Sequence, residues 1–119
     1  MDDKIKKIVV VSEIEVTLSV IGGKYKPLIL NLLSEKTVQR FGEIRAYIIN
    51  ISQKTLTNQL REMEADGLLT RTVFAEVPPR VEYTITDKGC SLIPILLLMC
   101  DWGYENMGDR YTLLRPECD

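Results

Sequence analysis

Apolar residues recur every three or four positions through the first half of the chain. This spacing buries one face of an α-helix, and it predicts four helices before residue 67. Their expected ranges are about 13–21, 25–33, 41–47 and 53–66. Gly22 and Gly67 follow the first and the fourth of these segments, as glycine commonly does where a helix ends. Ser52 precedes the fourth segment and is expected to cap it.

The periodicity then changes from helical to alternating. Residues 69–76 are rich in β-branched and aromatic side chains, and residues 81–86 alternate apolar with polar positions. Both patterns are typical of strands, and the Pro-rich loop between them fits the tip of a hairpin. Residues 38–40 can hold a further, very short strand. From Thr86 or Asp87 onward we expect one last helix of about 20 residues.

Four helices, a β-hairpin and a final helix form the predicted order of elements. A helix-turn-helix followed directly by a two-stranded hairpin is the winged-helix arrangement, so the expected fold is mainly α with a small β-hairpin (α+β). A chain of 119 residues with 45% apolar content suits one compact domain over residues 1–119. Residues 107–119 are expected to form a tail.

Composition argues against several classes of protein. The chain has three cysteines and no histidine, and no two cysteines form a CxxC pair, so neither a structural zinc site nor a secreted disulfide framework is expected. No GxSxG, HExxH or GxGxxG motif is present, and we predict no enzyme and no cofactor. The longest apolar run contains Pro94 and is shorter than the roughly 20 residues of a membrane span. Without a visible secretory signal, a cytoplasmic protein is expected.

Charge is distributed unevenly along the chain. The net charge is −2, yet residues 24–61 hold seven basic and two acidic side chains. The segments on either side carry an excess of acids. A basic middle between acidic ends is compatible with binding to nucleic acid, and equally with an ordinary solvated surface.

The predicted fourth helix separates its side chains into two faces. Leu56, Leu60 and Met63 share one face and would pack against the preceding helix. The opposite face offers donors and acceptors suited to base edges and phosphates in a major groove. Its candidate DNA-binding residues are Ser52, Gln53, Lys54, Thr55, Thr57, Asn58 and Arg61. A solvated surface helix has the same pattern, but the lack of an acid on this face before Glu62 and the hairpin that follows favour DNA.

Four further cations are candidates for contact with DNA. Arg80, at the tip of the proposed wing, can enter a minor groove, although an exposed charge that keeps the hairpin soluble is the alternative. Lys24, Lys26 and Arg40 are candidates for contact with phosphates. For Arg71, phosphate contact and surface decoration fit equally well.

The apolar surplus of the last predicted helix indicates a partner. Between residues 92 and 102 apolar side chains fall on more than one face, whereas a small domain covers only one side of such a helix. We therefore predict a dimer interface made by this helix and residues 5–20, with a core helix inside one subunit as the alternative. The candidate interface residues are Leu18, Leu92, Leu96, Leu97, Met99 and Trp102.

Three stretches of the sequence resemble the HxlR-type winged helix-turn-helix regulators, which are related to the MarR-like regulators. They are IGGKYKPLIL (21–30), RFGEIRAYIINISQKTLTNQLREMEADGLLTR (40–71) and VPPRVEYTITDKGCSLIPILLLMCDWG (77–103). The resemblance covers about residues 13–106, and its combination of ISQKxLxxQLREMExDGL with PPRVEYTxT is specific. The matching positions are Lys24, Ser52, Gln53, Lys54, Leu56, Gln59, Leu60, Arg61, Gly67, Pro79, Arg80, Tyr83, Gly89 and Trp102.

This resemblance implies a bacterial or archaeal transcription factor that binds a palindromic operator as a dimer. Tyr25 stands where many relatives have Trp. Ser12 stands where many relatives carry a Cys that some use to sense oxidants or electrophiles, so that route is in doubt here. Cys90 and Cys100 are expected to pack as small hydrophobes, and Cys118 to be the more accessible thiol.

The sequence therefore predicts a sequence-specific transcriptional regulator, a homodimer on double-stranded operator DNA, with an unidentified small-molecule effector as a further partner to test for. The alternative is a winged-helix module that binds another protein and no DNA. Such a module is expected to carry acidic or apolar groups on the outer face of the fourth helix, where Lys54, Asn58 and Arg61 stand.

Overall fold

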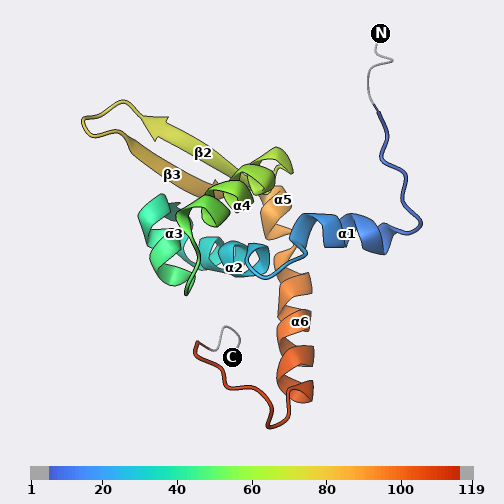
Figure 1. The fold of residues 1–119 in the computed structure, drawn as a ribbon. Coiled ribbons are helices and arrows are strands. Elements are labelled where there is room, and N and C mark those ends of the chain that lie inside the picture. Colours follow the sequence, from blue (N-terminus) through green and yellow to red (C-terminus); the bar gives the residue numbers. More distant parts are fainter. Residues whose placement is uncertain (1–5, 116–119) are drawn as a thin grey trace.

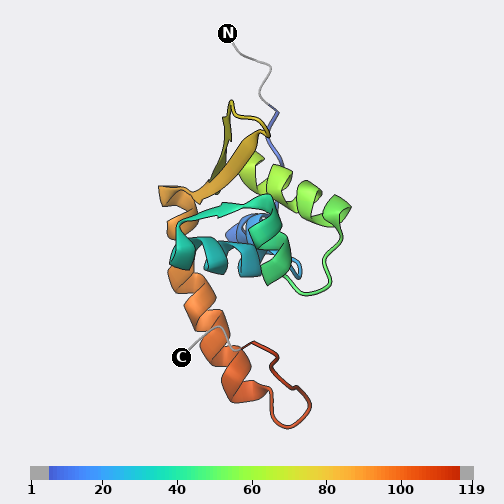
Figure 2. The same ribbon diagram turned by 90° about the vertical axis from the view of Figure 1, so that its left-hand side faces the viewer.

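Residues 6–115 are described by the structure, a computed structural model. The helices are α1 (Glu13–Ile21), α2 (Lys26–Lys36), α3 (Phe41–Tyr47), α4 (Gln53–Ala65), α5 (Asp87–Cys90) and α6 (Ile93–Asn106). The strands are β1 (Val38–Arg40), β2 (Leu69–Phe74) and β3 (Arg80–Ile85). The β2–β3 hairpin and α6 project from opposite ends of the helical core (Figures 1 and 2). The predicted winged helix-turn-helix is confirmed.

Capping residues place the ends of the first and fourth helices where the sequence predicts them. The backbone N–H of Ile14 donates to the hydroxyl of Ser12 at 3.1 Å, and that of Thr55 donates to the hydroxyl of Ser52 at 3.0 Å. Each cap satisfies a donor that the first turn of a helix leaves free. Gly67 takes a φ of 79° just after α4, the left-handed conformation that ends a helix and that favours glycine.

The core surrounds α2, whose Ile29, Leu30 and Leu33 are fully buried. The predicted inner face of α4, made of Leu56, Leu60 and Met63, packs into the same cluster. Burial of each such side chain stabilises the fold by about 1.5–3 kcal/mol. The opposite face of α4 is therefore held outward by the packing of this one.

The three strands form one antiparallel sheet in the order β1–β3–β2. The short β1 pairs with β3 so that Arg40 lies opposite Glu82, and β2 pairs with β3 from Leu69 opposite Ile85 to Phe74 opposite Arg80. Because β1 leads directly into α3, the sheet joins the hairpin to the helix-turn-helix. The wing is thus anchored at its base and free only at its tip, residues 75–79.

The prediction of one long final helix is wrong, because the chain forms two helices, α5 and α6. Pro94 stands in the first turn of α6. Proline has no N–H to continue the ladder of a preceding helix, and its ring collides with the carbonyl four residues before it, here that of Cys90. The chain therefore ends one helix and starts another, and α6 takes its own direction.

The junction of α4, β3 and α5 is tightly packed. The hydroxyl of Thr86 donates to the carbonyl oxygen of Gly67 at 2.6 Å and caps α5 by accepting from the N–H of Gly89 at 3.0 Å. A Cβ on Gly89 would lie only 2.3 Å from the carbonyl oxygen of Leu68, so no larger residue fits there. This junction fixes the end of α4 against the base of the wing.

Candidate nucleic-acid interface

The predicted reading surface on α4 is solvent-accessible as a block. Gln53, Lys54, Asn58 and Arg61 are exposed, as is the capping Ser52. Thr55 and Thr57 are half-buried at the margins of this surface. The structure thus brings together all seven candidate residues of the cap and the fourth helix.

Hydrogen bonds within the helix divide these residues into two groups. The Ser52 hydroxyl donates to Oγ1 of Thr55 at 2.9 Å, and the Thr57 hydroxyl donates to the carbonyl oxygen of Gln53 at 2.8 Å. The hydroxyl protons of Ser52 and Thr57 are therefore occupied inside the protein. We expect them to shape the start of α4 more than to donate to a ligand.

The four longer polar side chains are free. In the part of the chain that the structure describes, the side chains of Gln53, Lys54, Asn58 and Arg61 make no hydrogen bond and no ion pair. The helix has no acid in its first turn that would neutralise Lys54. Two cations and two amides thus face solvent without partners along α4. Of these, Gln53 and Lys54 lie in the first turn, where the helix dipole favours a phosphate.

A groove of about 470 Å³ separates α4 from the wing. Gln53, Thr57 and Arg61, spaced four residues apart, line its helix side. Arg71 and Tyr83 line its strand side. Lys54 and Asn58 are not part of this groove, so α4 presents one row of polar side chains toward the wing and another away from it.

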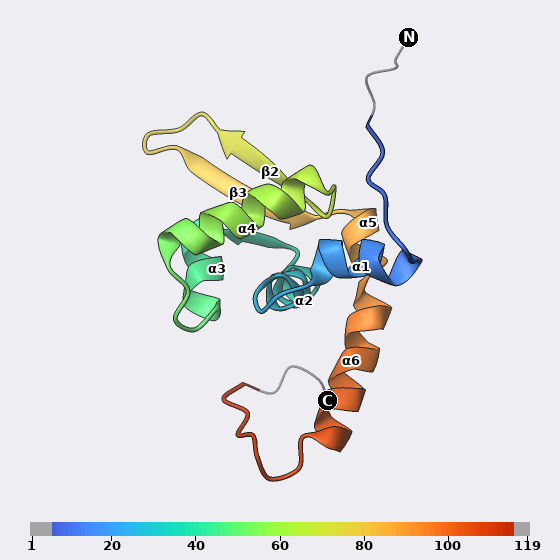
Figure 3. The same ribbon diagram turned by 45° about the vertical axis from the view of Figure 1, so that its right-hand side comes forward.

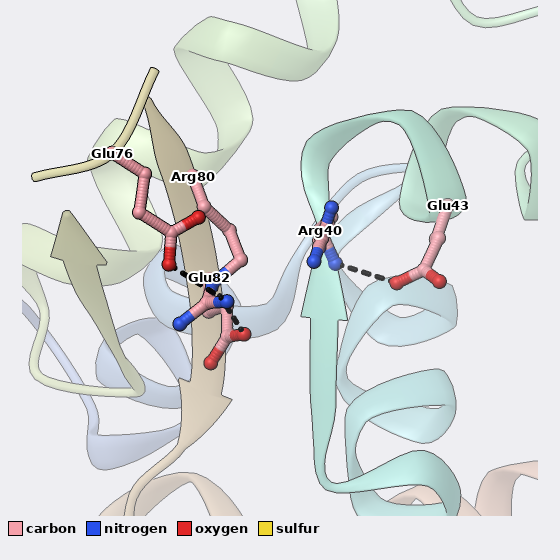
Figure 4. Close-up of polar contacts among 5 residues, drawn as sticks. All are labelled: Arg40, Glu43, Glu76, Arg80 and Glu82. Atoms are coloured by element: carbon pink, nitrogen blue, oxygen red, sulfur yellow. Dashed lines mark hydrogen bonds and ion pairs between the residues drawn. The ribbon is translucent and has the colours of Figure 1, made fainter. Parts of the chain in front are cut away.

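Arg80 differs from the cations of α4 because its charge is already paired. It is the first residue of β3, next to the tip loop, and its Nη1 lies 3.1 Å from Oε2 of Glu76 while its Nε lies 3.2 Å from Oε2 of Glu82 (Figure 4). The guanidinium carbon also lies 4.0 Å from the centroid of the Phe74 ring. Arg80 therefore braces the tip end of the wing through two carboxylates and one aromatic ring.

Two more of the candidate cations, Arg40 and Lys24, lie outside the α4 surface. Arg40 ends β1, and its backbone N–H donates to Oε1 of Glu43 at 2.8 Å as the cap of α3 (Figure 4). Lys24 precedes α2, with its Nζ 5.5 Å from the centroid of the Tyr25 ring. Both side chains are exposed, and each adds positive charge next to an element of the helix-turn-helix.

Lys26 was expected to be available to a phosphate, but it is buried in an ion pair that ties α2 to α4. Nζ of Lys26 lies 2.7 Å from Oε1 of Glu62, and the lysine side chain is only 8% exposed. Lys26 is separated from Glu62 by a whole helix-turn-helix in the sequence, so no local spacing indicates the pair. It fixes the C-terminal half of α4 against the core.

The candidate dimer residues divide into exposed and buried ones. Leu18 and Trp102 are 58% and 68% exposed, and Leu97 and Met99 are also exposed. Leu92 is half-buried against the core, and Leu96 is 6% exposed within it. Leu96 therefore packs inside its own subunit and is not available to a second copy.

The cysteines differ from expectation. Cys90 is free but exposed on α5, and Cys100 is disulfide-bonded, so neither packs as the small core hydrophobe that the sequence suggested. Cys118 lies outside the described residues. Among residues 6–115 no three acidic or cysteine side chains come close enough to hold a metal ion. No helix in the same range is long and apolar enough to cross a membrane.

Comparison with known proteins agrees with this geometry. Residues 20–111 match the family described as HxlR-like helix-turn-helix. An HTH-type transcriptional regulator of Halalkalibacterium halodurans is 50% identical over 93 residues, which cover 78% of this chain and 82% of the relative. One from Methanothermobacter thermautotrophicus is 48% identical and covers 82% and 78%. The reduced form of the redox regulator HypR superimposes with a TM-score of 0.77 at 44% identity, covering 84% of this chain and all of the other.

Proposed function

The chain belongs to the HxlR-like helix-turn-helix family of transcriptional regulators, and we propose that it binds a palindromic operator as a homodimer. The observation that carries this proposal is the exposed, unpartnered set Gln53, Lys54, Asn58 and Arg61 on the outer face of α4. Free amides and cations side by side on one helix face are suited to duplex DNA. The major groove offers hydrogen-bonding base edges, and the phosphates that flank it carry negative charge.

We assign two tasks to the side chains of α4. Asn58 and Arg61 have the fork-like ends that pair with adenine and guanine edges, so they read bases. Lys54 and the backbone N–H groups at the start of α4 are suited to a phosphate, which positions the helix without reading sequence. Arg71 lines the groove beside the wing together with Arg61 and Glu64, so Arg71 is a further candidate for contact with a phosphate.

The dimer is supported by apolar surface on the side of the molecule away from the wing tip (Figures 1 and 3). Ile14 and Leu18 of α1 and Leu97 and Leu98 of α6 are all exposed. The extended segment before α1 adds an exposed stretch, 8–11, made only of valine and isoleucine. A second copy would cover these groups and present two α4 helices on one side of the dimer.

A winged-helix module that binds protein instead of DNA is the alternative. Such a module gains affinity from apolar or acidic groups on the outer face of α4, and this face has neither among Gln53, Lys54, Asn58 and Arg61. The relatives reported above are named as transcriptional regulators. These two observations favour DNA.

Selection of bound duplexes from a random DNA pool tests the proposal. We expect two inverted half-sites whose centres lie about 10 bp apart, or a multiple of that distance, because the two α4 helices meet successive major grooves. A selected pool without inverted symmetry would contradict the homodimer. Recovery of no sequence above the starting pool would contradict DNA reading altogether.

A further inference from the structure

The last described part of the chain turns back from α6 toward α3 (Figure 3). We call residues 107–115 the strap. Gly108 permits the reversal with a φ of 60°. At the other end of the strap, Arg115 donates a hydrogen bond to the carbonyl oxygen of Tyr47, and its guanidinium carbon lies 4.0 Å from the centroid of the Tyr47 ring. The strap therefore connects the end of α6 to the last residue of α3.

A pocket of about 760 Å³ lies between the strap, α6 and the start of α2. Sites for small organic ligands occupy about 300 to 1,000 Å³ and are lined mainly by apolar and aromatic groups. This pocket has both properties. Its apolar and aromatic lining residues are Leu28, Met99, Trp102, Tyr104, Met107, Tyr111 and Leu113.

Charge at the pocket has one sign. Arg110 and Arg115 both line it, and no aspartate or glutamate does. Asp109 precedes Arg110 in the sequence but is not among the lining residues. Arg115 is engaged with Tyr47, whereas Arg110 has no ion pair within residues 6–115. A free guanidinium beside an apolar wall is complementary to a molecule with an apolar body and one carboxylate.

We propose that this pocket binds an amphipathic organic anion, with its apolar body against Trp102 and its carboxylate at Arg110. A neutral ligand of the same shape lacks a partner for the guanidinium, and a cation is repelled by two arginines. The ligand class thus follows from the lining: an aromatic or medium-chain aliphatic carboxylic acid in its ionised form.

Binding of a ligand in the pocket is also expected to affect α4, the helix proposed to read bases. This consequence rests on the proposed function. Tyr47 ends α3, and only the turn 48–52 separates it from α4. A ligand that moves the strap shifts Arg115 and with it the end of α3. Met99 and Trp102 belong both to the pocket and to the proposed dimer surface, so the site borders the interface that sets the distance between the two α4 helices.

Trp102 makes the site directly measurable, because it is the one tryptophan of the chain. Phenylbutyrate serves as the probe and its uncharged amide as the matched control, with excitation at wavelengths where only tryptophan absorbs. We expect a saturable change in fluorescence with phenylbutyrate and about tenfold weaker binding of the amide, the cost of losing one charge-assisted contact. Calorimetry of the full chain provides a second, fluorescence-independent binding constant.

Two variants test the position of the ligand. Gly103 lines the pocket, and a Cβ there meets no atom within 4 Å. Gly103→Leu is therefore chosen to place a larger apolar side chain at the pocket, and we expect it to abolish binding. Arg110→Gln should weaken phenylbutyrate by about five- to tenfold and leave the amide unchanged. Lys36→Gln is the control, since it removes an exposed cation that does not line the pocket. Circular dichroism confirms that each variant is folded.

Failure of the pocket and failure of the proposed function would give different results. Absence of saturable binding, equal affinity for acid and amide, or full binding by Gly103→Leu would each overturn the site. With the selected operator, phenylbutyrate should change the affinity of the wild type by at least about threefold and leave Gly103→Leu unaffected. Binding of the acid without that change would overturn the link to α4. If no operator is found at all, the fluorescence titration still decides whether the pocket exists.

Discussion

The outer face of α4 and the tip end of the wing both carry arginine, but the two arginines differ in whether their charge is already paired. Arg61 on α4 has no carboxylate partner in the described chain, whereas Arg80 on the wing lies within 3.1 to 3.2 Å of two. The first arginine can pair with DNA at no internal cost. The second must give up Glu76 and Glu82 before it can pair with anything else.

This difference gives the two arginines different roles: Arg61 is free to read bases, whereas Arg80 stabilises the wing. The Arg80 side chain is 28% exposed, and its partners Glu76 and Glu82 are 48% and 25% exposed. Ion pairs open to solvent stabilise a protein by only about 0–1 kcal/mol, so a phosphate can compete with Glu76 for Arg80 more readily than with the half-buried Glu82. In the proposed complex, however, the two carboxylates would stay near the DNA and repel it. We therefore expect α4 to supply most of the affinity and all of the base recognition, and the wing to add a smaller, shape-dependent contribution.

The largest expected effect comes from disrupting the proposed dimer, in which both regions occur twice. Leu97→Glu places a charge in the proposed interface, at a side chain that is 49% exposed in the single subunit. We expect a folded monomer whose operator affinity falls by about 10²–10⁴-fold, because each half-site is then bound alone. Light scattering and a DNA titration measure the two effects, with Glu105→Gln on α6 as the control. A dimer that persists in Leu97→Glu would place the interface elsewhere.

On α4 itself, Asn58→Ala and Arg61→Ala should each cost about 1–3 kcal/mol of binding free energy on the preferred operator. Neither side chain makes a hydrogen bond or an ion pair within the described chain, so thermal stability should stay unchanged within about 0.5 kcal/mol. Fluorescence anisotropy with a labelled operator gives the binding constants. An unchanged affinity in both variants would show that this face of α4 is not the reading surface.

The salt dependence of DNA binding should also differ between α4 and the wing. Each phosphate contact contributes a slope of about −0.9 in log K against log salt concentration. Lys54→Gln should reduce the slope by about one contact per subunit, because the Lys54 ammonium is free to bind phosphate. The same titration on Arg80→Gln should change the slope less, since its charge is shared with Glu76 and Glu82. Equal changes in slope would remove the distinction between the regions.

The smallest change in operator affinity is expected from variants of the wing, and it should be a gain and not a loss. Replacing both carboxylates, Glu76→Gln with Glu82→Gln, frees Arg80 and should tighten operator binding by up to about 1 kcal/mol. The gain should be larger on operators with A·T-rich flanks, where a narrow minor groove attracts a free cation. Adding Arg80→Ala to this double variant should abolish the gain. A gain that survives Arg80→Ala would mean that the carboxylates act on DNA directly.

Local signals in the sequence were sufficient for the helix-turn-helix. Ser52, the apolar stripe of Leu56, Leu60 and Met63, and Gly67 define α4 by themselves, and the structure confirms each. The break before α6 had a local signal as well in Pro94, but the apolar run around it suggested continuity. In that run the helical pattern could not distinguish the buried Leu96 from the exposed Leu97, because apolar side chains surround the helix.

Features that depend on distant segments could not be predicted. The pairing of Lys26 with Glu62 joins two helices, and the contact of Arg115 with Tyr47 joins residues 68 positions apart. The partners of Arg80 lie close in sequence, but their approach depends on the folded hairpin that brings Phe74 opposite Arg80. Sequence alone therefore located the cation of the wing without showing that its charge is already paired.

Parallel selections from one random DNA pool, with the wild type and with Asn58→Ala, test the reading role of α4 most directly. If Asn58 reads a base, the variant should select the same inverted half-sites at the same spacing but lose preference at one position in each half-site. Recovery of an identical motif by Asn58→Ala, at every position and with the same affinity, would contradict the assignment of this surface.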